Sequence, residues 1–174
     1  MRWLWLALVL ACGGSQEQPA PRRDSQFSLA KQTVGKPADG LTLRSIRHAP
    51  HEGYYRIVFD IGMTEGKPAR TVPHATAVYQ ARDRSIELNI AGVREDLTGN
   101  RPLEAESGEP FGKPVPIRKP PVDHLGRLLV LDDSAVAYRI KLTREARFRL
   151  LGLTDPARIV VDIEDTGGSR PSPK

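Results

Sequence analysis

The sequence has few of the features that usually reinforce a small exported protein or carry catalysis. Its 174 residues include one cysteine, so no disulfide can form within the chain. Aromatic residues make up only 6% of the chain. No window repeats apolar residues with the 3.6-residue period of an amphipathic helix, and 15 prolines oppose long helices. The apolar run at residues 3–10 is shorter than the roughly 20 residues that a transmembrane helix needs. The fold must therefore rest on a hydrophobic core built mainly from strands.

Motifs for catalysis or cofactor binding are also missing. Gly-Lys-Pro occurs three times, but proline supplies neither the hydroxyl nor the free amide of a phosphate-binding loop. His48 and His51 flank a proline, and two histidines do not complete a tetrahedral zinc site. His74 and His124 lie far from them in the sequence and are typical of surface loops. There is no His-Glu-x-x-His helix and no Gly-x-Ser-x-Gly elbow. We therefore predict no enzyme, no metal site and no cofactor.

The single cysteine stands at a position that indicates export. A basic start is followed by an apolar run and by Val-Leu-Ala-Cys, which ends at Cys12. This order is typical of a secretory signal with a small residue before the cleavage site. It resembles the lipobox of bacterial lipoproteins, in which the cysteine is diacylated and becomes the new N-terminus. The sequence thus predicts a signal peptide at residues 1–11 and a lipid anchor to a bacterial membrane at Cys12. Gly13, which is not an aspartate, favours the outer membrane if the cell has two.

Polar segments flank the part of the chain that can form a core. Residues 12–39 are rich in Gly, Ser, Gln, Pro and Lys, which is typical of a flexible linker. Phe27 and Leu29 are a brief apolar exception that could dock on the domain. Residues 166–174 are predicted to form a disordered tail, which leaves one domain at residues 40–165.

Within the domain, apolar and polar residues alternate with the two-residue period of strands. In the clearest segment, Tyr55, Ile57, Phe59 and Ile61 share one face. Strong candidates are residues 41–47 (with a bulge), 54–61, 85–90, 136–142 and 159–163, and weaker ones are 71–79, 128–131 and 148–153. Residues 99–121 contain six prolines and are predicted to be a long loop. We predict an all-β fold, an antiparallel sandwich or barrel.

A cluster of cations is the candidate binding surface. If residues 135–142 and 146–153 formed a hairpin, the outer face would carry like charges opposite each other. The pairs would be Arg139 with Arg149 and Lys141 with Arg147. Either carboxylates such as Asp162 and Glu164 on the last strand offset these charges, or an anionic ligand does.

Two blocks resemble the AMIN-like domain family. The sequence His-Glu-Gly-Tyr-Tyr-Arg-Ile-Val-Phe-Asp at residues 51–60 is similar to the early block of the family. Phe-Arg-Leu at residues 148–150 and Asp-Pro-Ala-Arg-Ile-Val-Val-Asp at 155–162 are similar to its closing block. Tyr55 stands where the family usually has aspartate, which removes a possible ion pair with Arg56. The resemblance implies a β-sandwich without enzymatic activity, in which Arg56 and Arg158 pair with strand carboxylates such as Asp60 or Asp162.

Taken together, these features predict a cell-envelope lipoprotein with one AMIN-like domain. Related AMIN domains target proteins to the cell wall, so the resemblance implies binding to peptidoglycan or another anionic envelope polymer. The net charge of +5 fits such a polymer, and export excludes nucleic acid as the partner. The alternative is an envelope protein partner, bound by adding a strand at a sheet edge. An enzyme using scattered histidines and carboxylates is a third alternative.

Overall fold

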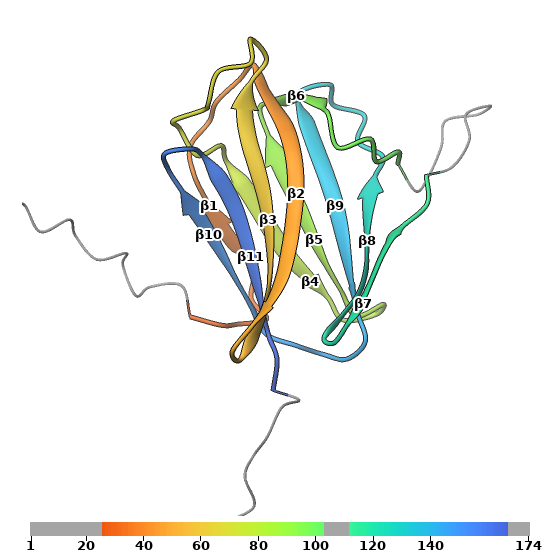
Figure 1. Cartoon of the computed structure of the whole chain (residues 1–174). Coiled ribbons are helices and arrows are strands. Elements are labelled where there is room, and N and C mark those ends of the chain that lie inside the picture. The colour runs from red at the N-terminus through yellow and green to blue at the C-terminus, as the bar shows by residue number, and fades with distance from the viewer. Residues whose placement is uncertain (1–25, 103–111, 167–174) are drawn as a thin grey trace, which may run out of the picture.

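Eleven β-strands follow one another along the chain, and no helix interrupts them in the part that the structure describes (Figure 1). The structure is a computed structural model, and it describes residues 26–102 and 112–166. The strands are β1 (Gln32–Val34), β2 (Leu41–His51), β3 (Tyr54–Met63), β4 (Ala75–Gln80), β5 (Ser85–Ala91), β6 (Val93–Asp96), β7 (Val115–Lys119), β8 (Val122–Leu128), β9 (Ala135–Leu142), β10 (Phe148–Leu153) and β11 (Arg158–Glu164).

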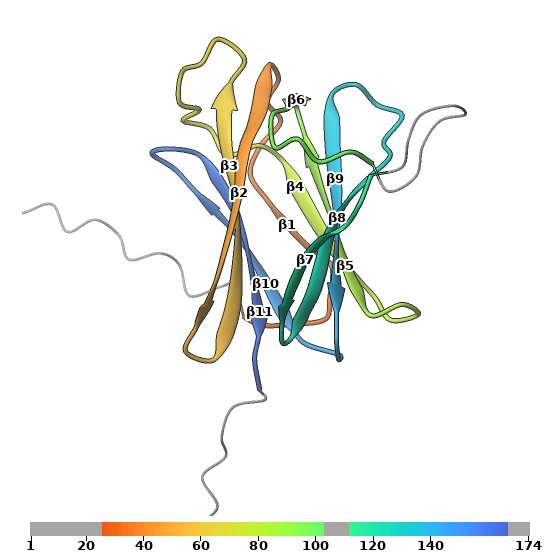
Figure 2. The ribbon, with the colours of Figure 1, turned by 45° about the vertical axis from the view of Figure 1, so that its right-hand side comes forward.

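The strands form two sheets that face each other, which confirms the predicted all-β sandwich (Figure 2). The six-stranded sheet has the order β1-β4-β5-β9-β8-β7, and the five-stranded sheet has the order β10-β11-β3-β2-β6. All neighbours are antiparallel except β2 and β6, which run parallel. The core lies between the sheets, where the rings of Phe59 and Tyr138 meet with centroids 5.4 Å apart.

The predicted alternation is confirmed in the central strands. In β3 the buried residues include Tyr55, Ile57, Phe59 and Ile61. The apolar residues at every second position of β5 and of β9 are buried as well. The predicted bulge in β2 is present, since the register to β3 shifts between Leu43 and Ser45. The core is built by this alternation, as the lack of disulfides and amphipathic helices requires.

Several predicted boundaries differ from the structure. The linker predicted at 12–39 ends too late, because β1 pairs with β4 and the Gln32 side chain bonds the backbone of Phe148 and Leu150 in β10. The loop predicted at 99–121 contains β7, a short strand at the edge of the six-stranded sheet. The weak strand predicted at 128–131 is the end of β8, which stops at Leu128. Strands this short or proline-rich show too little alternation to be found from sequence.

The hairpin predicted between residues 135–142 and 146–153 is wrong. Ile140 of β9 pairs with Ile86 of β5 and Leu125 of β8, so both edges of β9 are occupied. Phe148 of β10 pairs with Ile163 of β11 in the other sheet. The connection at 143–147 therefore crosses from one sheet to the other. Alternation identifies the inward face of a strand but not the sheet to which the strand belongs.

Candidate functional site

The outward face of the five-stranded sheet carries arginines on four strands. We call this surface the arginine face and define it by Arg47 of β2, Arg56 of β3, Arg149 of β10 and Arg158 of β11. These side chains alternate with the buried residues of their strands and so point away from the core. The strand register sets Ala49, Arg56, Asp162 and Arg149 side by side in one row across the sheet.

Asp162 is the centre of this row. Although it occupies an outward position, its side chain is 0% exposed, because two guanidinium groups cover it. Arg56 donates from Nε to Oδ1 at 2.7 Å and from Nη2 to Oδ2 at 2.8 Å, and Arg149 donates from Nε to Oδ2 at 2.8 Å. The hydrogen bonds to Asp162 raise the pKa of Arg56 above its usual value. One carboxylate thus holds two cations in fixed positions and leaves the trio with an excess positive charge.

Aromatic rings pack against the same two arginines. The guanidinium carbons of Arg56 and Arg149 each lie 5.2 Å from the centroid of the Tyr54 ring. The Phe27 ring lies 4.7 Å from the Arg149 guanidinium, so this residue does dock on the domain. His51 stacks on Tyr54 with centroids 4.9 Å apart and planes 10° from parallel. These cation–π and stacking contacts further restrict the arginine rotamers.

A groove of about 360 Å³ crosses the arginine face beside this row. The apolar surface of the groove comes from Val58, Val160 and Leu153. The rest of its lining comes from Arg47, Arg56, Arg158, His48, Ala49 and His51. Arg47 is held by Asp60 through two bonds of 2.7 and 2.8 Å. The Nε of Arg158 donates to the backbone oxygen of Pro156 at 3.2 Å, and within residues 26–102 and 112–166 its guanidinium forms no ion pair. Arg158 is therefore the cation of the groove that is best placed to take an external anion.

The pairing of Asp60 makes stability depend on pH. The hydrogen bond from Arg47 lowers the pKa of Asp60 below its ordinary value of 3.8. Because this pKa is depressed in the folded state, the pair stabilises the fold above the unfolded pKa, and the stabilisation is lost as the pH falls through the folded pKa. We expect the difference in unfolding free energy between wild type and Asp60→Asn to shrink as the pH falls from about 5 to about 2. Urea titrations at each pH would measure it, and a constant difference would contradict the pairing.

The four cations predicted as a binding surface lie on two different sheets. Arg139 and Lys141 are on β9, where Arg139 pairs with Glu87 at 2.9 Å and Lys141 donates to the backbone oxygen of Asp83. Arg147 pairs with Glu164 at 2.6 Å, and Arg149 pairs with Asp162. The structure thus brings together Arg147 and Arg149 but not all four, and each has a partner within the protein. Asp162 and Glu164 are the carboxylates that the sequence suggested for this purpose.

The predicted structural role of Arg56 agrees with its bonds to Asp162, whereas Arg158 differs from its prediction. Arg158 stands opposite Asp60 in the register, and its charge helps to lower the pKa of Asp60, but its hydrogen bond goes to the Pro156 backbone. Sequence reasoning also missed Arg47 as a groove residue. The available signal was that Arg47, Arg56 and Arg158 all occupy outward positions of strands.

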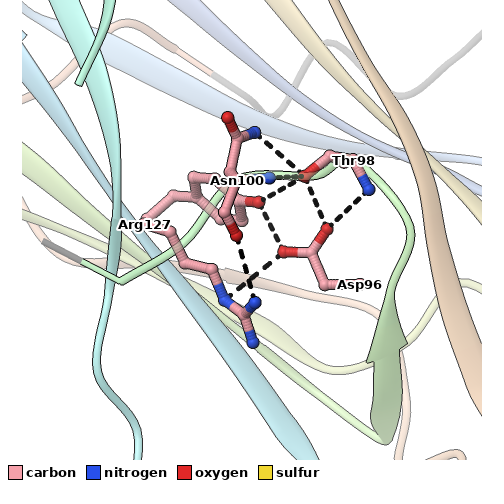
Figure 3. Close-up of polar contacts among 5 residues, drawn as sticks. Asp96, Thr98, Asn100 and Arg127 are labelled. Atoms are coloured by element: carbon pink, nitrogen blue, oxygen red, sulfur yellow. Dashed lines mark hydrogen bonds and ion pairs between the residues drawn. The ribbon is translucent and has the colours of Figure 1, made fainter. Parts of the chain in front are cut away.

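A second polar cluster is buried beneath the loop that follows β6 (Figure 3). The Asp96 side chain is 1% exposed and accepts bonds of 2.6 Å from both Tyr138 Oη and Thr98 Oγ1. Arg127 Nε lies 3.4 Å from Asp96 Oδ2, and its Nη1 donates to the Asn100 backbone oxygen at 3.2 Å. Burial raises the pKa of the Tyr138 hydroxyl far above its usual range. A neutral tyrosine with its donor committed to Asp96 is suited to holding the loop on β8 and β9.

Removing the Tyr138 hydroxyl tests this structural role. We expect Tyr138→Phe to lower the free energy of unfolding by about 1–2 kcal/mol, because Asp96 loses one of its buried donors. Urea denaturation would measure the loss, and sacculus binding should not change. A stability equal to that of wild type would contradict the role of the cluster.

The remaining sequence predictions have different outcomes. Cys12, the predicted signal at 1–11 and all but the first residue of the tail predicted at 166–174 lie outside the described residues. Among residues 26–102 and 112–166, no three His, Cys, Asp or Glu side chains are arranged to hold a metal ion. In the same part of the chain, no helix has the length and apolarity to span a membrane. His48 bonds Tyr55 Oη through Nδ1 at 2.7 Å, and His51 stacks on Tyr54.

Comparison with known proteins identifies a family. A family model described as "AMIN-like domain" matches residues 41–165, which spans nearly all of the sandwich from β2 onward. No curated protein and no solved structure matches the chain.

Proposed function

Because the chain belongs to the AMIN-like domain family, we propose that it is a non-catalytic envelope lipoprotein that binds peptidoglycan or a related anionic glycan through the arginine face. The domain type indicates an envelope protein with a peptidoglycan-related role, and AMIN-like domains are generally binding domains without catalytic activity. The finer statements, namely the lipid anchor, the ligand and the surface that binds it, are our proposal.

The observation that carries this proposal is the groove on the arginine face. It combines apolar surface from Val58 and Leu153 with the guanidinium of Arg158, which in the described chain forms no hydrogen bond or close ion pair with a carboxylate, although its charge acts on the nearby Asp60. A wall polymer offers the matching chemistry, since its sugar rings have apolar faces and its peptide stems carry carboxylates. Arginine binds carboxylates with a two-pronged geometry that lysine cannot reproduce. The neighbouring arginines are already fixed by Asp60 and Asp162, so binding would order few additional side chains.

Pelleting with purified peptidoglycan sacculi across a salt series tests this function. The full chain, kept in mild detergent, should pellet with sacculi and should remain bound at about 1 M salt, where simple charge attraction is screened within a few ångströms. Loss of binding as salt rises would contradict a shaped site and indicate general cationic adhesion. No binding at any salt would contradict the glycan function itself.

The anchor at Cys12 is tested separately. Cells that express the protein and grow on labelled palmitate should incorporate the label, and Cys12→Ser should abolish incorporation because the thiol is the site of acylation. The protein should then move from the membrane fraction to the soluble fraction, since two or more acyl chains are needed for stable anchoring. Label retained in Cys12→Ser would contradict the proposed anchor.

A further inference from the structure

The five-stranded sheet has an open edge along most of β2. Strand β6 pairs only with Leu41–Leu43 at the beginning of β2. One more bond follows, from Leu97 N to the Leu43 oxygen, and no further backbone partner of β2 lies on that side within residues 26–102 and 112–166. Beyond Leu43, and as far as the described residues go, β2 therefore has a hydrogen-bonded neighbour only in β3. A strand with one unpaired side is a template for another strand.

The register identifies the backbone groups that face this edge. Ile61 N bonds the Ala157 oxygen and Asp165 N bonds the Gly53 oxygen, so the odd-numbered residues of β3 point toward β11. The even-numbered residues of β3 then point toward β2, where they stand opposite Ser45, Arg47, Ala49 and His51. In β2 the intervening residues, Ile46, His48 and Pro50, direct their backbone groups outward. Ile46 and His48 each offer an N–H and a carbonyl, and Pro50 offers a carbonyl alone.

An apolar groove lies directly beside this edge, between the two sheets. Its volume is about 350 Å³, and its apolar surface comes from Ile46, Leu97, Val115 and Leu125. Leu97 and Val115 are 58% and 37% exposed, which is high for large apolar side chains. A side chain from a strand added at the edge would enter this groove, because Ile46 packs against the core and the exposed His48 bonds Tyr55, an inward residue of β3, so both lie on the groove side of the sheet.

We propose that residues 46–50 of β2 bind an extended segment of a partner polypeptide, which adds a strand to the five-stranded sheet and places an apolar side chain in the groove. The outward side chains of that segment are acidic, because Arg44 lines the edge and, in the described chain, bonds only the Lys67 backbone oxygen and no carboxylate. A second copy of the chain would bring a second Arg44 to the edge and would set Pro50, which has no N–H, against its own edge. The partner is therefore a different protein. This inference does not depend on the proposed glycan binding.

A designed peptide tests the edge directly. The probe is a fluorescent seven-residue peptide that alternates valine with glutamate, compared with the same peptide carrying lysine in place of glutamate and with a backbone N-methylated form. The full chain in mild detergent should bind the acidic peptide with a Kd below about 1 mM and the other two at least about tenfold more weakly. Hydrogen exchange followed by NMR should show new protection at the Ile46 and His48 amides, the two donors at the edge.

Two variants and a matched control complete the test. Leu97→Asp removes apolar surface from the groove at an exposed position. His48→Pro removes a backbone N–H that forms no bond to β3, and its effect is compared with that of His48→Ala, because both variants lose the side-chain bond to Tyr55. Leu97→Asp and His48→Pro should each weaken peptide binding by about tenfold or more. Leu131→Asp is the control, because Leu131 is 84% exposed and does not line the groove. Any of three results would overturn the proposal. They are no binding at about 1 mM peptide, binding without protection of the two amides, and binding by Leu97→Asp that equals that of the wild type. Sacculus binding should be unchanged in Leu97→Asp, so failure here and failure of the glycan function are distinguishable.

Discussion

Replacing Asp162 with asparagine is expected to lower the free energy of unfolding by about 3 kcal/mol. Asp162 is fully buried and accepts hydrogen bonds from two guanidinium groups, so the substitution removes their common counter-charge. Arg56 and Arg149 are only 28% and 27% exposed, and water can solvate them only in part. Breaking a buried pair by removing one partner is among the most costly single changes, because it leaves an uncompensated charge. Chemical denaturation with urea would measure the loss.

The matched control lies on the same strand and the same face. Glu164 pairs with Arg147, whose side chain is 57% exposed, and ion pairs of this kind contribute little. Glu164→Gln should therefore cost less than about 1 kcal/mol. If the two variants were equally stable, the central role of Asp162 on the arginine face would be contradicted. Replacing Arg149 would remove a donor from buried Asp162 and lower stability, so Arg149 is unsuited to tests of binding.

The sequence predicted the fold well wherever strands are long and half buried. Alternation in β3 and β9 identified the inward side chains, and the paired inward positions of Leu43 and Ile46 identified the bulge in β2. The two blocks at 51–60 and 148–162 identified the family that the matching model confirms. These signals are local, because each depends on residues two positions apart or on a continuous motif.

The candidate site could be predicted only in part, because it depends on which strands become neighbours. Arg56 and Asp162 are 106 positions apart and meet because β3 and β11 pair in this register. The error over β9 and β10 arose in the same way, since consecutive strands were assumed to pair although the connection crosses between sheets. The open edge of β2 was likewise hidden, because it exists only where the short β6 ends.

Reversing the charge of Arg158 is expected to weaken sacculus binding by about tenfold or more, which corresponds to about 1.4 kcal/mol. In the described chain this guanidinium donates to a backbone oxygen and forms no hydrogen bond to a carboxylate, so its remaining N–H groups are available to an anionic group in the groove even though Asp60 lies nearby. Arg158→Glu places a carboxylate near Asp60 and would repel the same anion. Arg158→Lys keeps the charge but loses the planar fork, and it should bind with intermediate strength.

The control for this prediction is Arg82→Glu, in the exposed turn between β4 and β5 of the other sheet. It changes the net charge by the same amount at a position remote from the groove, so it separates a site from a general effect of charge. Pelleting of each variant with sacculi at low and high salt gives the comparison, and urea denaturation confirms that both variants are folded. Equal weakening by the two variants would show that binding follows net charge alone. Weakening by Arg158→Glu alone, still present at high salt, is the result that a shaped groove requires, because screening removes long-range attraction but not a direct contact.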